Sequence, residues 1–287
     1  MNNSTLLARR GLRGALETRR DAKVLKTDPI CVYDLAERMG VEVRFHCANS
    51  FGGMYAKISQ TVLVPSLRPA GRRAFTCAHE LGHWYFNHGD RVDQFESIDK
   101  IDNENPDERL VNIYASYLLM PSWVVADAFN RRGLNPQTCS PENFYLVSCQ
   151  LGVGYETLIQ HSFRSLNLIP SYRATDLLKI TPKEIKSMVL GNMANEGHLI
   201  IADPYWNAVP IDLQVGDRAI LPKGIVLEGT CVTPIASCPL GQVVEGHAPG
   251  IGRAESKETK WSVFMRVSRK DFEGRSVYRH LEDPDLE

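Results

Sequence analysis

His79-Glu80-Leu81-Gly82-His83 is the stretch of this sequence on which the interpretation of the rest depends. It lies inside a segment predicted to be helical over about residues 72–86, and the four-residue spacing puts both imidazoles on one helix face. Neutral imidazoles are good ligands for Zn²⁺, and Glu80 lies beside them, where a carboxylate can take a proton from water held by the ion. The motif therefore predicts His79 and His83 as metal ligands and Glu80 as a general base.

His88 is one of two candidates for the third protein ligand that a catalytic zinc site requires. It lies nine residues after His79, which is one residue short of the spacing in the metzincin pattern, and Phe86 stands where that pattern has a glycine. We therefore expect His88 to have a structural role or to hold another ligand in place.

Glu108 is the preferred third ligand. It follows His83 by 25 residues and lies near the start of a second predicted helix, over about residues 106–117, in the manner of a gluzincin carboxylate delivered from another helix. Asn112 lies one turn later and is placed to hydrogen-bond a ligand. Glu108 can also be explained as a charge that complements the helix dipole. Two other acids remain as alternative ligands: Glu104 and Asp107.

Two blocks of the sequence resemble the ImmA/IrrE family of metallopeptidases. The first runs from Arg73 to His83, and the second runs from Glu108 to Pro121 and closes on Leu-Leu-Met-Pro. Together with a glycine pair at residues 52–53, the resemblance covers about residues 25–125. Three positions depart from the family's preferences, and none of them is a candidate ligand: Leu110, Val111 and Tyr114.

The resemblance implies zinc bound by His79, His83 and Glu108, with Glu80 as the catalytic residue. Mn²⁺ and Fe²⁺ also suit two histidines and a carboxylate, so the identity of the metal stays open. Members of the family typically act as regulatory endopeptidases that cut a helix-turn-helix repressor of the XRE type after DNA damage or in mobile elements. An XRE-type repressor is therefore the expected protein substrate.

The expected fold class is α+β, in three segments. Residues 1–130 are predicted to form a gluzincin-like zinc peptidase domain of helices and a small sheet, which includes a hairpin over residues 54–64. Residues 131–175 are predicted to be helical and to resemble a helix-turn-helix. Residues 176–287 are predicted to form a mainly β, antiparallel domain with a regulatory or sensor role, because short apolar runs from His198 onward are separated by Gly, Pro and Asp.

The helix-turn-helix resemblance rests on residues 148–158, which have the small residue and the Gly-Val pair that the turn requires. The recognition helix of such a motif, at residues 155–166, would offer only His161 and Arg164 to phosphates or bases, with Glu156 opposing them. We therefore do not expect direct DNA binding, and we expect this segment to pack between the two flanking domains.

The composition is that of an ordinary globular protein, with 43% hydrophobic and 23% charged residues and a formal net charge of -1. This balance excludes a global attraction to nucleic acid or to an anionic membrane, and the basic segment at residues 1–27 is expected to be a solvated helix face. No apolar stretch approaches the roughly 18 residues of a membrane span, and residues 1–10 lack the apolar region of a signal peptide. A cytoplasmic protein with reduced cysteines is expected.

These observations favour a zinc-dependent endopeptidase that cleaves a specific regulatory protein. The substrate is expected to lie along an edge strand of the small sheet, within residues 54–64. The C-terminal β domain is expected to bind a signal ligand or partner, and the acidic segment at residues 90–108 is expected to be a surface loop. Two alternatives remain open: a non-proteolytic, antitoxin-like regulator that uses the peptidase fold as a scaffold, and a zinc hydrolase of small amides.

Overall fold

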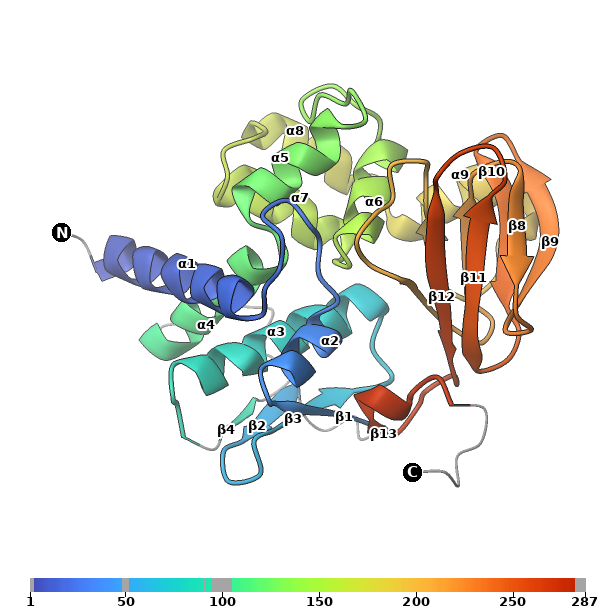
Figure 1. Ribbon diagram of the computed structural model, residues 1–287. Coiled ribbons are helices and arrows are strands. Elements are labelled where there is room, and N and C mark those ends of the chain that lie inside the picture. Colours follow the sequence, from blue (N-terminus) through green and yellow to red (C-terminus); the bar gives the residue numbers. More distant parts are fainter. Residues whose placement is uncertain (1–2, 48–51, 90, 94–104, 282–287) are drawn as a thin grey trace. The chain divides into compact units, whose positions relative to one another are not determined.

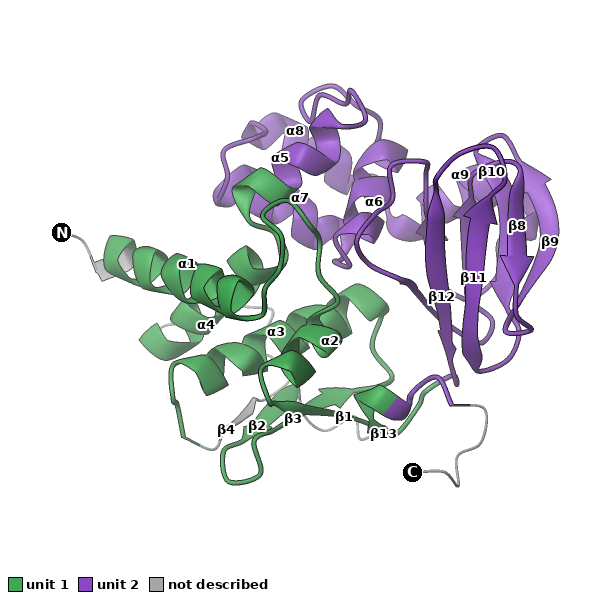
Figure 2. Cartoon of the chain, viewed as in Figure 1, with its two compact units in different colours: residues 1–124, 271–277 green, residues 125–270, 278–287 purple. Residues whose placement is uncertain are grey.

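The computed structural model describes residues 3–47, 52–89, 91–93 and 105–281. The chain divides into two compact units, and Figure 2 shows them in different colours. Unit 1 consists of residues 1–124 and 271–277, and unit 2 consists of residues 125–270 and 278–287. Both units combine helices with sheets, which confirms the α+β class at the coarse level. The finer division into a peptidase, a helical and a β domain stays a prediction.

Unit 1 combines helices with one sheet, and the two helices on which the site depends form where the sequence predicts them. The predicted helix at residues 72–86 is α3, and the predicted helix at residues 106–117 is α4. Pro106 occupies the first turn of α4, and the Asn105 side chain accepts a hydrogen bond from the Asp107 backbone N–H at 3.0 Å, which explains why the helix begins there. The helices of unit 1 are α1 (Asn3–Asp21), α2 (Val32–Arg38), α3 (Ala70–Tyr85) and α4 (Pro106–Leu119).

One sheet completes unit 1, with the strand order β13-β1-β3-β2-β4. The predicted hairpin is present, since β2 pairs with β3 in antiparallel register, whereas β1 pairs with β3 in parallel. The strands are β1 (Glu42–His46), β2 (Gly53–Ala56), β3 (Thr61–Pro65), β4 (Arg91–Asp93) and β13 (Gly274–Arg275). The expectation that residues 54–64 supply an edge strand is wrong, because β2 lies between β3 and β4 and β3 lies between β1 and β2.

The elements of unit 1 lie in layers (Figure 1). The helix α3 packs against β2 and β3, α4 packs against α3, and α1 packs against α4. Apolar side chains of the strands, including Val62 and Val64, are fully buried beneath α3. Burial of both sides of α3 explains why nearly every residue from Ala74 to His83 is inaccessible to solvent.

The outer strand β13 comes from the far end of the chain. Its backbone pairs with β1 at Arg44 and Phe45, and Phe272 packs its ring edge-on against Phe45, with the ring centroids 6.3 Å apart. The buried Ser276 donates a hydrogen bond to Glu37 at 3.2 Å. Residues 271–277, which the sequence assigns to the C-terminal domain, therefore complete the sheet of unit 1.

Four α-helices lie between residues 131 and 197 of unit 2, after α5. The helices α6 and α7 are joined by a short turn in which Gly152 has a φ of 65°, and the resemblance of this segment to a helix-turn-helix stays a prediction. His161, one of the two side chains considered for DNA contact, is buried. The helices are α5 (Ser122–Asn130), which begins in unit 1, α6 (Pro141–Gln150), α7 (Tyr155–Arg164), α8 (Ser171–Leu178) and α9 (Pro182–Leu190).

Two four-stranded sheets form the β part of unit 2, with the orders β5-β7-β10-β9 and β6-β12-β11-β8. The expectation of an antiparallel domain is wrong in part, because β5 pairs with β7 in parallel and β6 pairs with β12 in parallel. The strands are β5 (Leu199–Ile201), β6 (Ile211–Gln214), β7 (Arg218–Leu221), β8 (Ile225–Glu228), β9 (Val232–Cys238), β10 (Gly241–Gly246), β11 (Gly250–Ser256) and β12 (Ser262–Ser268).

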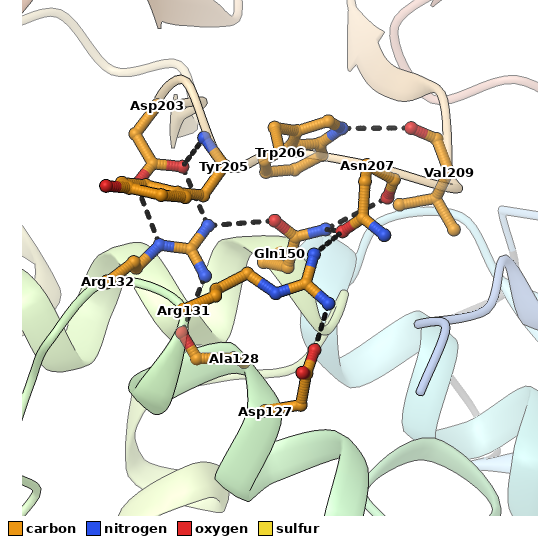
Figure 3. A network of polar contacts seen from close by, with 10 residues as sticks. All are labelled: Asp127, Ala128, Arg131, Arg132, Gln150, Asp203, Tyr205, Trp206, Asn207 and Val209. Carbon is orange, nitrogen blue, oxygen red and sulfur yellow. Dashed lines mark hydrogen bonds and ion pairs between the residues drawn. The ribbon is translucent and has the colours of Figure 1, made fainter. Parts of the chain in front are cut away.

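A polar network joins the helices and the β part of unit 2 (Figure 3). The Arg132 guanidinium donates to both carboxylate oxygens of Asp203, each at 2.7 Å, to Gln150 at 2.9 Å and to the Ala128 carbonyl at 2.8 Å. The Gln150 amide in turn donates to the Asn207 carbonyl at 3.0 Å. The network thus fixes the segment before β6 to α5 and α6.

Within the described part of the chain, no helix has the length and apolar character that crossing a bilayer demands.

Candidate metal centre

His79 and His83 face the same side of α3, as their spacing predicts. Both side chains are fully buried, and their Nε2 atoms lie 3.2 Å apart. Gly82 lies between them on the face toward α4, where a Cβ would come within 2.9 Å of the Val111 Cβ. The absence of a side chain at Gly82 therefore lets α4 approach α3 closely enough to bring its own residues to the histidines.

Glu108 reaches the same point from the first turn of α4. One carboxylate oxygen lies 3.3 Å from the His79 Nε2 and the other lies 3.7 Å from the His83 Nε2. Burial of the Glu108 carboxyl opposes its ionisation, but the adjacent imidazoles of His79 and His83 outweigh burial and hold the pKa of this carboxyl well below its usual value. A charged carboxylate is the form that binds a metal ion.

The donor set fits a tetrahedral metal ion. His79, His83 and Glu108 each offer one ligand atom, and these atoms lie within 4.8 Å of one another in a buried position. Bonds of about 2.0–2.2 Å to nitrogen and oxygen imply tetrahedral edges of about 3.3–3.6 Å. The two Nε2 atoms are 3.2 Å apart, and each lies 3.3 or 3.7 Å from one of the two Glu108 oxygens, which is close to that range. The three residues can therefore supply three corners of a tetrahedron and leave the fourth open.

Two further side chains orient the imidazoles. The Nδ1 of His79 lies 2.9 Å from the Asn112 Oδ1, which can only accept, so Nδ1 carries the proton and Nε2 presents its lone pair to the centre. The Nδ1 of His83 lies 3.0 Å from the Nδ1 of His88, whose Nε2 is 3.7 Å from an Asp107 oxygen. Asn112 and His88 are thus located where the sequence analysis expects them, behind the two histidines.

Glu80 is fully buried on α3 and its carboxylate is directed at β2. A Cβ at Gly53 would lie 2.4 Å from the Glu80 Oε1 and 2.6 Å from the Thr76 Cγ2. Only a residue without a side chain leaves room for the carboxylate there. Gly53 is not among the candidate site residues predicted from the sequence, although the glycine pair at 52–53 is a signal for this close approach.

The structure describes one of the two alternative ligands, Asp107, and not the other, Glu104. Asp107 is next to Glu108 on α4, but its carboxylate lies beside His88 rather than among the three donor atoms. Glu104, and with it most of the acidic segment at residues 90–108, lies outside the described residues. Glu108 is therefore the carboxylate that the structure brings to His79 and His83.

Comparison with known proteins agrees with the sequence blocks. Residues 34–139 match the family model of the IrrE N-terminal-like domain, a peptidase family. A transcriptional regulator of Mycobacterium tuberculosis is similar in structure over 54% of this chain and 46% of that chain, with 18% sequence identity and a TM-score of 0.36. The similar region thus spans less than half of that regulator. No curated protein sequence gives a significant match.

Proposed function

We propose that this chain, whose residues 34–139 match the IrrE N-terminal-like domain and support an ImmA/IrrE family protein, is a zinc-dependent endopeptidase that cleaves a specific regulatory protein. One observation carries the proposal: two imidazoles and a carboxylate from α3 and α4 converge within 4.8 Å, beside the buried Glu80. A scaffold that only binds a partner has no need of a buried carboxylate next to such a donor set. We propose His79, His83 and Glu108 as the ligands.

Zinc in this site would supply a Lewis acid that polarises a carbonyl oxygen and lowers the pKa of water to about 7. Glu80 then acts as the general base that takes a proton from the attacking water and returns it to the leaving amine. Asn112 and His88 hold the imidazoles of His79 and His83 in the orientation in which each Nε2 is directed at the proposed metal site. Because Gly53 has no side chain, the Glu80 carboxylate has room next to β2.

The substrate is proposed to be a protein of the XRE repressor type, cut in an extended segment. Asp93 of β4 pairs with Gly53, so β4 is the outer strand of the described sheet on the Glu80 side. Strand addition at this edge would hold a peptide by its backbone with little demand on its sequence. A signal received by unit 2 is proposed to control cleavage.

The test is incubation of the purified chain with the repressor encoded beside its gene and with Zn²⁺ or Mn²⁺. Intact mass spectrometry of the repressor then detects any cut. Wild-type protein is expected to make one defined cut, and Glu80→Gln is expected to make none while it binds one equivalent of metal. Loss of the general base alone typically costs about 10²–10⁴-fold in rate.

Two results would argue against the proposal. Cleavage by Glu80→Gln at the wild-type rate would show that another residue or a contaminating protease is responsible. If the wild type binds metal but cuts no repressor, and Glu80→Gln retains the biological output of the wild type in cells, the chain acts as a binding regulator.

A further inference from the structure

We infer that α1 is a positioning element of the metal centre and that it acts through the contact between Thr18 and Tyr114. The inference rests on the proposed function, because it takes His79, His83 and Glu108 as metal ligands. The helix α1 precedes residues 34–139, which match the peptidase family, yet it is part of unit 1 and packs along α4. A helix outside the family domain thus contacts the helix that carries Glu108.

Tyr114 connects the two helices that supply the ligands. It is fully buried on α4, the helix of Glu108 and Asn112. Its ring packs on α3, because a Cβ at Gly82 would lie 3.1 Å from the Tyr114 Cδ1. Gly82 immediately precedes His83, so the position of this ring sets how closely α4 approaches the histidines.

The hydroxyl end of Tyr114 reaches α1. Its oxygen lies 2.8 Å from the Oγ1 of Thr18, and both side chains are fully buried. Tyr85, in the last turn of α3, stacks on Tyr114 with ring centroids 5.5 Å apart and donates its hydroxyl to Glu17. Tyrosines from both ligand-bearing helices therefore bond to neighbouring residues of α1.

The helix α1 packs closely against α4 and against the end of α3. A Cβ at Gly11 would lie 2.6 Å from the Ile113 Cγ2, and a Cβ at Gly14 would lie 2.7 Å from the Tyr85 Cε1. The buried Arg19 donates to the Leu118 carbonyl at the end of α4, at 2.9 Å. These contacts fix how closely α1 packs against α4 and the end of α3, and they also fix its position along its own axis.

The consequence concerns the spacing of the donor atoms. The two imidazoles and the Glu108 carboxylate lie 3.2 to 3.7 Å from one another, close to the edges of a coordination tetrahedron, and these distances depend on how α3 packs against α4. The bond from Thr18 to Tyr114 ties α4 to a third helix at a point six residues beyond Glu108. Its loss should allow α4 to move and weaken metal binding without removing any ligand.

The experiment compares Thr18→Val, Tyr114→Phe and the double variant, each of which removes a hydroxyl and keeps the approximate shape of the side chain. Competition with a chromophoric chelator, at a temperature well below unfolding, measures the Kd for Zn²⁺, and the visible spectrum of the Co²⁺ form reports ligand geometry. Each single variant is expected to raise the Kd about 3- to 10-fold, less than the 10–100-fold of a direct partner of a ligand. The double variant should be no worse than the single ones, since both remove the same bond.

The matched control is Tyr145→Phe, which removes another buried tyrosine hydroxyl bond, from Tyr145 to the Leu199 carbonyl at 2.6 Å in unit 2. It should lower the melting temperature but leave the Kd and the Co²⁺ spectrum unchanged. Thr18→Ser retains a hydroxyl and should retain wild-type affinity, which supports the inference even if a more drastic variant does not fold.

Three outcomes are decisive. Wild-type Kd in folded Thr18→Val and Tyr114→Phe would overturn the inference and leave α1 with a structural role only, while the proposed function stands. An equal rise of Kd in Tyr145→Phe would also overturn it, because affinity would then follow global stability. A wild-type protein that binds no metal would overturn both the inference and the proposed function.

Discussion

Gly53 shows how a residue with no chemistry of its own determines the position of one that has. The carboxylate of Glu80 occupies the place where a side chain at Gly53 would be, since Oε1 lies 2.4 Å from the ideal Cβ position. Contacts this short are not tolerated between a carbon and an oxygen, so either the strand or the carboxylate must move when a methyl group is added. The carboxylate is the more mobile of the two.

We therefore expect Gly53→Ala to displace Glu80 and to lower the rate of the proposed repressor cleavage at least about 10-fold, because a misplaced base loses most of its effect. Zinc content should stay at the wild-type level, since Gly53 contacts no proposed ligand side chain in the close approaches described above. Cleavage kinetics together with metal analysis of the same samples provide the measurement. Gly89→Ala is the control, because a Cβ there meets nothing within 4 Å. Equal losses in both variants would contradict this explanation.

From the sequence, the residues that meet in the site can be predicted better than the contacts that hold those residues in place. His79 and His83 meet because four residues make about one helical turn, and the sequence blocks indicate Glu108. Thr18 and Tyr114 are 96 residues apart, and no local pattern pairs them. Tyr114, one of the departures from the family's preferences, uses its hydroxyl in this contact.

Among the elements, helices were easier to predict than the pairing of strands. The helices α3 and α4 differ from the predicted ranges by about two residues, because apolar periodicity and Pro106 are local signals. The parallel pairs β5–β7 and β6–β12 could not be foreseen, since alternation of apolar residues identifies a strand but not its partner. The same reason explains why β2 was expected at an edge.

Arg132 provides a test of how the elements of unit 2 are joined. Its side chain is only 3% exposed, and the Asp203 carboxylate that it binds is 17% exposed. Arg132→Met would leave Asp203 and Gln150 without their shared donor in a largely dry site. We expect the free energy of unfolding to fall by about 3 kcal/mol, as for other broken buried ion pairs. Urea denaturation followed by tryptophan fluorescence measures the change.

Arg131→Met is the matched variant for this test. Arg131 has a side chain that is 24% exposed and binds Asp127 and Asn207, so its loss should cost only about 1 kcal/mol or less. Equal effects of the two substitutions would mean that the burial of Arg132 does not make its ion pair more important than the neighbouring one.

At the scale of the whole molecule, the order of the chain and the division into units do not coincide. Unit 1 includes residues 271–277, after the chain has passed through residues 125–270. These residues place β13 along the outer edge of β1, where Arg275 pairs with Glu42 at 3.0 Å and Glu273 accepts from the Cys47 backbone N–H at 2.6 Å. A strand of only two residues, Gly274 and Arg275, carries little sequence signal, so this return was not predictable.

A chain that stops after residue 270 should therefore lose an outer strand of the sheet in unit 1. It would expose the edge of β1 and the face of Phe45 that Phe272 covers, and unit 1 should become protease-sensitive and lower in metal affinity. Limited proteolysis and zinc titration provide the measurement. A chain that stops after residue 281 keeps β13 and should behave as the full chain does; a wild-type pattern from the shorter chain would refute the role given to residues 271–277.

The return of β13 also has a consequence for biosynthesis. A ribosome delivers β1 early and β13 only after residues 125–270 have been synthesised, so the sheet beneath α3 stays incomplete during most of translation. Nascent chains and prematurely terminated fragments would then lack the finished support of Glu80 and the histidines. The proposed protease would then mature only once unit 2 has been made, which would protect the cell from cleavage by fragments that lack the part proposed to receive the signal.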